Sequence, residues 1–325
     1  MKPTINTQVC VIGAGSGGLS VASGTAQLGL STVLIEKDKM GGDCLNTGCV
    51  PSKALLAAAK HAQLIRSDRF IGISPVEPDI DFLSVKDHVM NVIRTIEPND
   101  SQERFEAMGV KVLRDHARFI TPDLIQSGSE IIKAKYTVIA TGSRPVIPPI
   151  NGIETVSTLT NETIFSLTDK PDHLLIVGAG PIGIEMAQAH KRLGCDVSVF
   201  DMATLLPRDD KQNVEILKKA LVSEGINLYE GIAIEEIKND NGRVKIHLAK
   251  NDKKFEIIGS HLLMAAGRAA NTDTLDLNKA GIDYNRTGII VDKRLRTSRK
   301  RVFAIGDVAG GPQFTHIAGY HAGIV

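Results

Sequence analysis

Two stretches of the chain, residues 8–36 and 173–201, repeat one pattern, and this repeat constrains the fold more than any other feature. Each stretch has an apolar run, a G-x-G-x-x-G turn, a helix-like segment that ends at glycine, a second apolar run and an acidic residue. From first glycine to acid both span 23 positions, Gly13 to Glu36 and Gly178 to Asp201. The repeat predicts an α/β fold with two Rossmann-like dinucleotide-binding domains.

The glycines of each turn have distinct physical tasks. The first permits a tight turn, the second lets backbone N–H groups approach a pyrophosphate at the helix N-terminus, and the third lets helix and strand pack closely. The acid that ends the second strand can accept hydrogen bonds from a ribose 2′-hydroxyl. Plain glycine turns without a nucleotide are the alternative. The complete context occurs twice, which favours two bound dinucleotides or two dinucleotide-shaped halves.

The segment GGDCLNTGCVPSK, residues 41–53, holds Cys44 and Cys49, two of the four cysteines. A close pair in a chain without a secreted disulfide framework is more often redox-active or metal-binding than structural. Zinc would need four ligands, and no second C-x-x-C or His pair lies nearby in sequence. We therefore favour redox chemistry and no metal site, with a metal site or two core thiols as alternatives. Cys10 and Cys195 lie in strand-like segments and are expected to be buried packing residues.

Charge and hydropathy exclude several kinds of partner. Lys+Arg 38 against Asp+Glu 37 leave a net charge of +1, so the attraction that dominates nucleic-acid binding is missing. No stretch approaches the roughly 18 consecutive apolar residues of a membrane span, and the N-terminus lacks a signal-peptide pattern. We expect a soluble, cytoplasmic protein without nucleic-acid or membrane partners.

The rest of the chain is organised around the two repeats. We expect a first domain in residues 1–150 that ends in the proline-rich linker SRPVIPPINGI, a second domain in residues 151–270 inserted into the first, and a return to the first domain in residues 271–325. Residues 51–67 and 84–109 are predicted to be helical, the latter interrupted near Pro98, and residues 110–120 and 130–143 to form strands. Near the end we expect a buried strand, a turn at Gly306 and a helix still unfinished at Val325, so the sequence reads as truncated.

Together these motifs resemble the pyridine nucleotide-disulfide oxidoreductases, the class that includes dihydrolipoamide dehydrogenase, glutathione reductase and mercuric reductase. The resemblance rests on the two fingerprints and on GGDCLNTGCVPSK, ATGSRP and AIGDVAG, and it runs from Val9 to His321. It implies FAD at the first fingerprint and NAD(P)H at the second. Electrons would pass from NAD(P)H through FAD to a redox-active disulfide, Cys44–Cys49, and on to a dithiol or disulfide substrate.

The resemblance also implies which residues bind each cofactor. Those for FAD are Gly13, Gly15, Ser16, Gly17, Gly18, Glu36, Lys37, Gly42, Asp43, Lys53, His116, Ala117, Thr141, Gly142, Asp307 and Thr315. Those for NAD(P) are Gly178, Gly180, Pro181, Ile182, Gly183, Glu185, Asp201 and Gly267. Asp201 would repel a 2′-phosphate, and VSVFDMATLLPR supplies an arginine only at Arg208, so NAD is favoured over NADP.

Four residues are implied in catalysis: Cys44, Cys49, Lys53 and Glu185. Cys44 resembles the interchange thiol that attacks an external disulfide, and Cys49 the thiol that faces the flavin. A helix N-terminus and a nearby cation such as Lys53 would favour the Cys49 thiolate. Lys53 and Glu185 resemble a family ion pair beside the flavin ring, and a solvated helix glutamate is the alternative interpretation of Glu185.

The family takes its acid/base from a C-terminal interface domain of the partner subunit in a homodimer, as a His supported by Glu, and that region is expected beyond residue 325. His316 and His321 are expected to have ordinary packing roles. We expect a parent protein most like dihydrolipoamide dehydrogenase, which interconverts dihydrolipoamide + NAD⁺ and lipoamide + NADH. A mercuric reductase-like enzyme or another disulfide reductase is the alternative, and a noncatalytic flavin- or NAD-binding module or redox sensor is the third hypothesis. The chain as given would be incomplete for full turnover.

Overall fold

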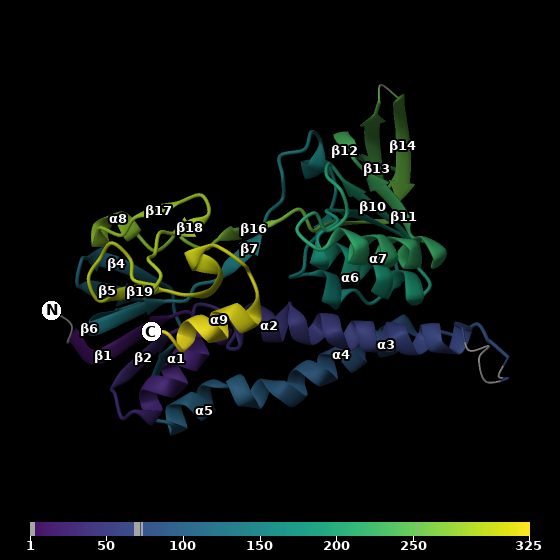
Figure 1. Ribbon diagram of the computed structural model, residues 1–325. Helices are drawn as coiled ribbons and strands as arrows, with labels where there is room; N and C mark the ends of the chain where they lie inside the picture. The colour runs from purple at the N-terminus through teal and green to yellow at the C-terminus, as the bar shows by residue number, and fades with distance from the viewer. Residues whose placement is uncertain (1–3, 68–71, 73, 252) are drawn as a thin grey trace. The chain divides into compact units, whose positions relative to one another are not determined.

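The computed structural model describes residues 4–67, 72, 74–251 and 253–325 (Figure 1). Its internal contacts divide the chain into two units. Unit 1 consists of Met1–Asn46, Ile93–Arg144 and Arg268–Val325, and unit 2 of Thr47–Val92 and Pro145–Gly267. Both units contain a sheet of parallel strands together with helices, so the predicted α/β class is confirmed.

Unit 1 is built on a sheet of order β3-β2-β1-β6-β5-β4, with β19 paired to β6 (Figure 1). The strands are β1 (Thr4–Ile12), β2 (Thr32–Ile35), β3 (Lys111–Leu113), β4 (Ala117–Thr121), β5 (Leu124–Ser127), β6 (Glu130–Ile139) and β19 (Val302–Ala304). The pairings are parallel from β3 to β6 and with β19, whereas β4, β5 and β6 form an antiparallel meander. Every residue of β2 is buried, as expected for a strand covered on both faces.

Helices and short strands complete unit 1. They are α1 (Ser16–Gln27), α2 (Gly42–Asn46), the 3₁₀ turns η1 (Glu97–Asp100) and η4 (Gly306–Ala309), α5 (Gln102–Ala107), α8 (Leu277–Ala280), α9 (Thr315–Ala322), β7 (Ser143–Pro145), β16 (Arg268–Ala270), β17 (Tyr284–Asn285) and β18 (Gly288–Ile289). Helix α1 packs against α9. The last expected helix is α9, but it ends at Ala322 and does not continue to Val325, because Gly323 is a poor helix former.

Unit 2 has a parallel sheet of order β11-β10-β9-β15-β8 and a separate antiparallel sheet, β12-β13-β14. The strands are β8 (Thr158–Leu159), β9 (His173–Val177), β10 (Asp196–Asp201), β11 (Asn227–Glu230), β12 (Ala233–Asp240), β13 (Arg243–Lys250), β14 (Lys253–Gly259) and β15 (His261–Met264). The helices are α3 (Cys49–Ser67), α6 (Pro181–Arg192), α7 (Lys211–Ser223), and the turns η2 (Ile153–Thr155) and η3 (Ile164–Ser166). Helix α3 packs against α6.

Several local predictions can be compared directly with these elements. The predicted interruption near Pro98 is confirmed, because α4 (Phe82–Ile96) and α5 are separated by η1, which contains that proline. Two segments were predicted to form strands. Residues 110–120 form two strands, β3 and β4, since residues 114–116 between them are not in a strand, and residues 130–143 contain β6. Strand β5 was not predicted. Cys10 and Cys195 are buried as expected, with 0% and 1% of their surfaces exposed. In the described residues, no helix is both long and apolar enough to cross a bilayer.

Candidate functional site

The first glycine of each repeated turn is required by its backbone and its surroundings. Gly13 and Gly178 have φ angles of +104° and +112°, a region that L side chains rarely adopt. A Cβ on Gly13 would lie 2.4 Å from the carbonyl oxygen of Ala140, and a Cβ on Gly178 would lie 2.3 Å from that of Ala265. Each turn therefore passes equally close to the residue that follows the neighbouring strand of its sheet, β6 for Gly13 and β15 for Gly178.

The third glycine of each turn brings the helix against the strand that precedes it. A Cβ on Gly18 would lie 1.8 Å from the carbonyl oxygen of Gly13, and a Cβ on Gly183 would lie 2.0 Å from that of Gly178. No side chain fits at such distances, so these two glycines set the height of α1 and α6 over their sheets. Gly17, next to Gly18, lies instead where α1 packs against Ala318 of α9.

The second glycine faces open space. Gly15 and Gly180 are the N-cap residues of α1 and α6, and neither helix has a side-chain cap. A Cβ on Gly180 would meet nothing within 4 Å, and the nearest atom to one on Gly15 would be Gly42 Cα at 3.9 Å. Uncapped first-turn N–H groups at the N-terminus of a 12-residue helix attract anions. Both turns thus fit a pyrophosphate, which can approach the backbone where a side chain would stand.

Glu36 and Asp201 occupy equivalent places at the ends of β2 and β10. In each repeat, the N–H of the residue after the first glycine donates to the acid, to Glu36 Oε2 at 2.6 Å and to Asp201 Oδ2 at 2.7 Å. Each carboxylate also accepts a second N–H, from Asp38 at 2.8 Å and from Ala203 at 2.7 Å. These bonds fix the orientation of both carboxylates and leave them lone pairs for ribose hydroxyls.

The residues of the cysteine segment lie on two helices. Cys44 is half-buried in α2, and Cys49 is the exposed first residue of α3. Lys53 lies one turn further along α3, and its Nζ donates to Glu185 Oε1 at 2.6 Å and to Oε2 at 2.7 Å. Glu185 projects from the second turn of α6. The ion pair implied by the resemblance is therefore present, whereas its place beside a flavin ring stays a prediction.

The comparisons with known proteins agree with this geometry. The family model described as pyridine nucleotide-disulphide oxidoreductase matches residues 7–322. The chain belongs to this family. Mercuric reductase from Lysinibacillus sphaericus is 30% identical over 98% of the chain and 59% of that protein. Dihydrolipoyl dehydrogenase 3 from Haloarcula marismortui is 35% identical over 96% of the chain and 68% of that protein.

A solved structure extends the likeness to three dimensions. The Cu(II) complex of the HOCl-induced flavoprotein disulfide reductase RclA from Escherichia coli has a TM-score of 0.87 and 29% identity, over 98% of this chain and 70% of that one. The α/β fold with FAD/NAD(P)-binding Rossmann-like parts is thereby confirmed. The chain spans only 59% and 50% of the first two mercuric reductases that it matches.

Members of the pyridine nucleotide-disulfide oxidoreductase family use FAD with NAD(P)H. The residues predicted for the two cofactors separate between the units, with Lys53 as the exception. Unit 1 carries Ser16, Lys37, Gly42, Asp43, His116, Ala117, Thr141, Gly142, Asp307 and Thr315 in addition to the first turn and Glu36. Unit 2 carries Pro181, Ile182, Glu185 and Gly267 in addition to the second turn and Asp201, and it also holds Lys53. The assignment of these residues to cofactors stays a prediction.

Arg268 was not predicted from the sequence to belong to the site. It contacts two residues predicted to bind FAD, Asp43 directly and Asp307 through Ser143. Its Nη2 donates to Asp43 Oδ2 at 2.5 Å and its Nε to Ser143 Oγ at 2.8 Å. Ser143 Oγ in turn donates to Asp307 Oδ2 at 2.5 Å. The Arg268 side chain is 12% exposed, so these charge-assisted bonds fix both acids. The one sequence feature that could have indicated a role for Arg268 is its position directly after Gly267, where the chain returns to unit 1.

A second missed residue, Asn271, closes the turn that contains Thr141 and Gly142. Thr141 Oγ1 donates to the Asn271 carbonyl at 2.8 Å, and Asn271 Nδ2 donates to the Thr141 carbonyl at 2.9 Å. Gly142 has a φ of +66°, and a Cβ there would meet nothing within 4 Å. This turn is therefore rigid and open on one side, which suits the close approach of a ring system.

Unit 1 contains three histidines, His116, His316 and His321. Burial, followed by the charge of Lys37, lowers the pKa of His116, one of the residues predicted to bind FAD. Burial also lowers the pKa of His321, whose Nδ1 accepts the Gly306 N–H at 3.1 Å. The ring of His316 stacks on Phe314 with centroids 5.4 Å apart. His316 and His321 thus have packing contacts, as expected.

Proposed function

We propose that the protein is a flavin-dependent oxidoreductase that passes two electrons from NADH through FAD to a disulfide formed by Cys44 and Cys49, and then to an external disulfide. Overall, NADH, a proton and a disulfide give NAD⁺ and a dithiol, and the reverse direction oxidises a dithiol. FAD, when bound, supplies a group that accepts two electrons from a hydride donor and delivers them to sulfur. The observation that carries the proposal is the duplicated open turn, which offers one pyrophosphate site in each unit.

The residues of unit 1 would hold FAD. The uncapped N-terminus of α1 at Gly15 would take the pyrophosphate, and Glu36 would accept hydrogen bonds from the adenosine ribose. Asp307, held by Ser143 and Arg268, would accept from the ribitol hydroxyls. Because these acids are already fixed by protein donors, they would bind without paying much ordering entropy.

The residues of unit 2 would hold NADH. The N-terminus of α6 at Gly180 would take its pyrophosphate, and Asp201 would accept from the 2′-hydroxyl of the adenosine ribose. A 2′-phosphate at that position would meet the Asp201 carboxylate. We therefore favour NADH over NADPH.

The two sulfurs would take different roles. Cys49 is the first residue of the 19-residue helix α3, and the partial positive charge of a helix N-terminus favours a thiolate over a thiol. Cys49 would therefore face the flavin, and Cys44 would attack the external disulfide. Lys53 would supply a cation near Cys49, and Glu185 would keep the Lys53 ammonium in place.

The substrate is most simply dihydrolipoamide, because the relatives include dihydrolipoyl dehydrogenases that are 35% and 36% identical to the chain. A mercuric reductase-like function is the second candidate, since relatives of that name are 30–33% identical. A cytoplasmic homodimer is our proposal for the parent protein. A comparison of dihydrolipoamide, glutathione disulfide and Hg(II) as reactants of the parent would separate these candidates.

Anaerobic reduction tests the electron path. The FAD-loaded chain is titrated with NADH, and the spectrum is followed for a long-wavelength thiolate-to-flavin charge-transfer band. We expect the band in the wild type, its loss in Cys49→Ser and its retention in Cys44→Ser, which is the matched control. A wild type that binds FAD and NADH without forming the band would favour the noncatalytic binding module, and a band that survives Cys49→Ser would reverse the roles of the sulfurs.

A further inference from the structure

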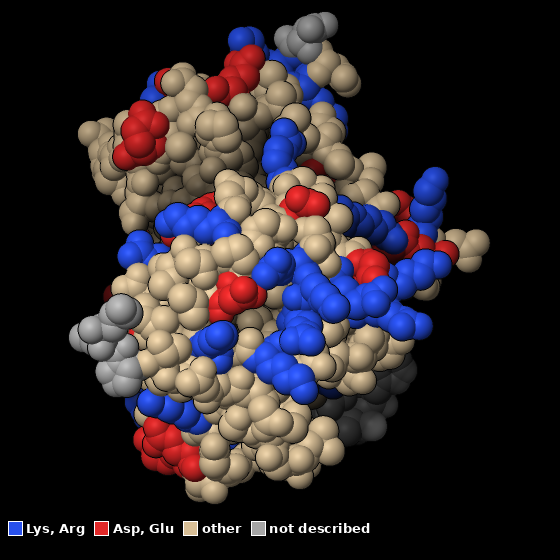
Figure 2. Space-filling view, turned by 90° about the vertical axis from the view of Figure 1, so that its left-hand side faces the viewer, with Lys and Arg blue, Asp and Glu red and all other residues tan. Residues whose placement is uncertain are grey.

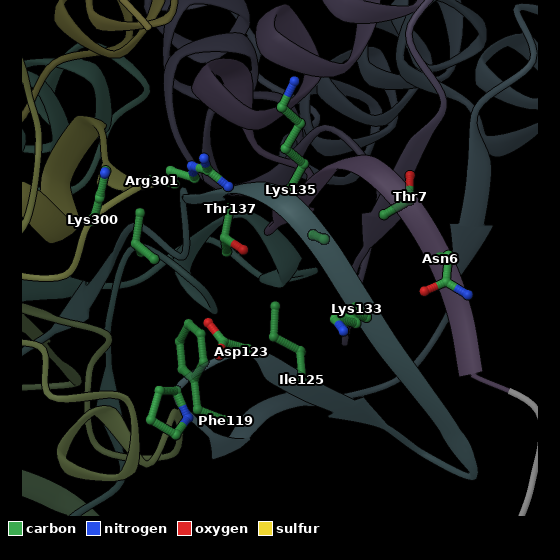
Figure 3. Close-up of a pocket in the computed structure, with 13 residues that line it drawn as sticks. Asn6, Thr7, Phe119, Asp123, Ile125, Lys133, Lys135, Thr137, Lys300 and Arg301 are labelled. Atoms are coloured by element: carbon green, nitrogen blue, oxygen red, sulfur yellow. The ribbon is translucent and has the colours of Figure 1, made fainter.

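A pocket of about 360 Å³ lies in unit 1, and the residues that line it include none of those predicted to bind a cofactor (Figure 3). Its walls come from β1, from the β4–β5–β6 meander and from the residues that lead into β19. Thr7 lies ahead of Gly13 on β1, and Val302 is the first residue of β19. The pocket therefore opens near the amino ends of these parallel strands, whereas the nucleotide turn follows their carboxyl ends. It is a separate feature of the sheet.

The rim of the pocket is strongly basic. It includes Lys133 and Lys135 of β6 and the adjacent pair Lys300 and Arg301, against one acid, Asp123. The whole chain has a net charge of only +1, so composition does not explain this gathering. Figure 2 shows one face of the molecule, on part of which Lys and Arg side chains gather with few Asp or Glu side chains among them.

In the described part of the chain, no ion pair involves the four rim cations, whereas Asp123 is already paired with Arg299 at 2.8 Å. Lys135 Nζ lies 5.5 Å from the centroid of the Tyr136 ring, a cation–π contact that attracts the ammonium without cancelling its positive charge. Like charges that line one pocket repel one another, and a bound anion would reduce that repulsion.

The backbone at Arg301 supports a binding role. Arg301 has a φ of +66°, a left-handed conformation that costs a non-glycine residue of order 1 kcal/mol. Its carbonyl accepts the Thr137 N–H at 3.0 Å, which holds this conformation against β6. Backbone strain of this kind is found at active sites and ligand clamps.

The floor of the pocket is apolar. Phe119 and Ile125, with 1% and 2% of their surfaces exposed, contribute to it together with Val302. Figure 3 shows Phe119 and Ile125 below Thr137, with Lys133 beside Ile125, Lys300 and Arg301 above them, and the Lys135 side chain pointing away from them. The volume lies at the lower end of the roughly 300–1,000 Å³ found for small-molecule pockets. The space suits a compact ligand with an apolar body and several charged groups.

We propose that this pocket binds a small multivalent oxyanion that carries phosphate or carboxylate groups on a compact body. The Arg301 guanidinium offers a planar fork for two oxygens of one group, and the lysines offer point charges for the others. Phosphorylated metabolites and polycarboxylates share this chemistry.

Calorimetry of the chain saturated with FAD and NAD⁺ tests the proposal, because both pyrophosphate sites are then filled. Sodium tripolyphosphate and citrate are the probes, at low ionic strength. We expect one of them to bind at a single site, and to bind about tenfold more weakly to Lys133→Gln/Lys300→Gln. The matched control, Lys111→Gln/Lys293→Gln, removes the same charge outside the pocket and should change affinity less than about twofold.

A second variant, expected to strengthen binding, tests the proposal even if Lys133→Gln/Lys300→Gln folds poorly. Asp123→Asn removes the acid from the rim and releases Arg299, so it should tighten binding severalfold. Preference for tripolyphosphate would identify a phosphorylated ligand, and preference for citrate a polycarboxylate. The proposal is overturned if neither probe binds, if the pocket and control variants weaken binding equally, or if Asp123→Asn leaves affinity unchanged.

Discussion

Lys53 and Glu185 lie 132 positions apart in the sequence, and the ammonium of one contacts both carboxylate oxygens of the other. The pair joins α3 to α6 within unit 2. At the far end of α3, Arg66 Nη1 donates to the carbonyl of Arg192, the last residue of α6. Helix α3, which begins with Cys49, thus contacts helix α6 through side chains near both ends of α3.

Loss of the Lys53–Glu185 ion pair should cost little stability. The two side chains are 58% and 34% exposed, and ion pairs of this kind contribute about 0–1 kcal/mol. A double-mutant cycle with Lys53→Met and Glu185→Gln, measured by urea unfolding, should give a coupling energy below about 1 kcal/mol. The same variants should slow reduction of the FAD-loaded chain by NADH. A large coupling energy with unchanged reduction would mean that the pair is structural.

The preference for NADH should depend on Asp201. Its carboxylate is oriented by the Ala179 and Ala203 N–H groups, and its charge would oppose a 2′-phosphate. In Asp201→Asn we expect the ratio of NADPH to NADH dissociation constants to fall by about tenfold. Asp196→Asn, at the other end of β10, is the control. An unchanged ratio in Asp201→Asn would contradict the ribose assignment.

The repeated turns could be predicted from sequence because their geometry is local. Gly13 and Gly178 are required by their φ angles and by one neighbouring strand, so spacing along the chain is sufficient information. The acids at Glu36 and Asp201 follow for the same reason. Even the hydrogen bonds of the two acids are alike, which the equal spacing anticipates.

The contacts of Arg268 could not be predicted, because they depend on segments far apart in the sequence. Arg268 contacts Asp43 across 225 positions and Ser143 across 125. The periodicity of apolar residues along the chain gives no information about contacts between residues so far apart in the sequence. Strand β5 was missed for a different reason: its four residues, LIQS, are too few for an alternation of apolar and polar side chains to be visible.

The two pairs of cysteines should differ sharply in reactivity. Burial raises the pKa of the Cys10 and Cys195 thiols to about 12, so at about pH 8 only about 10⁻⁴ of each is thiolate. After reduction, iodoacetamide should modify Cys44 and Cys49 in the folded protein and all four cysteines in guanidinium, as read by peptide mass spectrometry. Rapid labelling of Cys10 or Cys195 in the folded protein would show that their segments open.

His190 should make the protein less stable in mild acid. Its ring is 1% exposed and lies 6.2 Å from that of Phe82, and its Nδ1 bonds the Met186 carbonyl at 2.9 Å. Burial lowers its pKa to about 4, whereas the unfolded chain has the ordinary value near 6.5. Between these values unfolding takes up a proton, so the stability present above pH 6.5 is lost as the pH falls towards 4.

Urea unfolding at several pH values measures this effect. From pH 6.5 to 5 the free energy of unfolding should fall by about 1.5 kcal/mol on account of His190. His261, whose pKa is also lowered by burial, acts in the same direction and is present in both proteins compared. His190→Gln should therefore reduce the slope by nearly one proton without abolishing it. Equal slopes in the two proteins would mean that His190 is accessible to protons when folded.

Gly180 and Gly183 lie three positions apart in one turn and should respond to alanine in different ways. Gly180 has a φ of −77°, which alanine adopts freely, and its Cβ would meet no atom within 4 Å. Gly180→Ala should change stability by less than about 1 kcal/mol, because the lower entropy of the unfolded chain is opposed by the poor fit of alanine as an N-cap residue. The Cβ of Gly183→Ala would meet the Gly178 carbonyl oxygen at 2.0 Å, so this variant must lift α6 from β9 and lose stability.

The decisive difference is in cofactor binding. The methyl group of Gly180→Ala would occupy the space through which a pyrophosphate reaches the first N–H groups of α6, so the affinity for NADH should fall at least about tenfold in a stable protein. FAD binding, measured by flavin fluorescence, is the internal control, because the Gly15 turn is untouched. If Gly180→Ala binds NADH as tightly as the wild type, the open face of the second glycine is not where the nucleotide lies. The duplicated turn would then have a structural role in the fold and would not bind the cofactor.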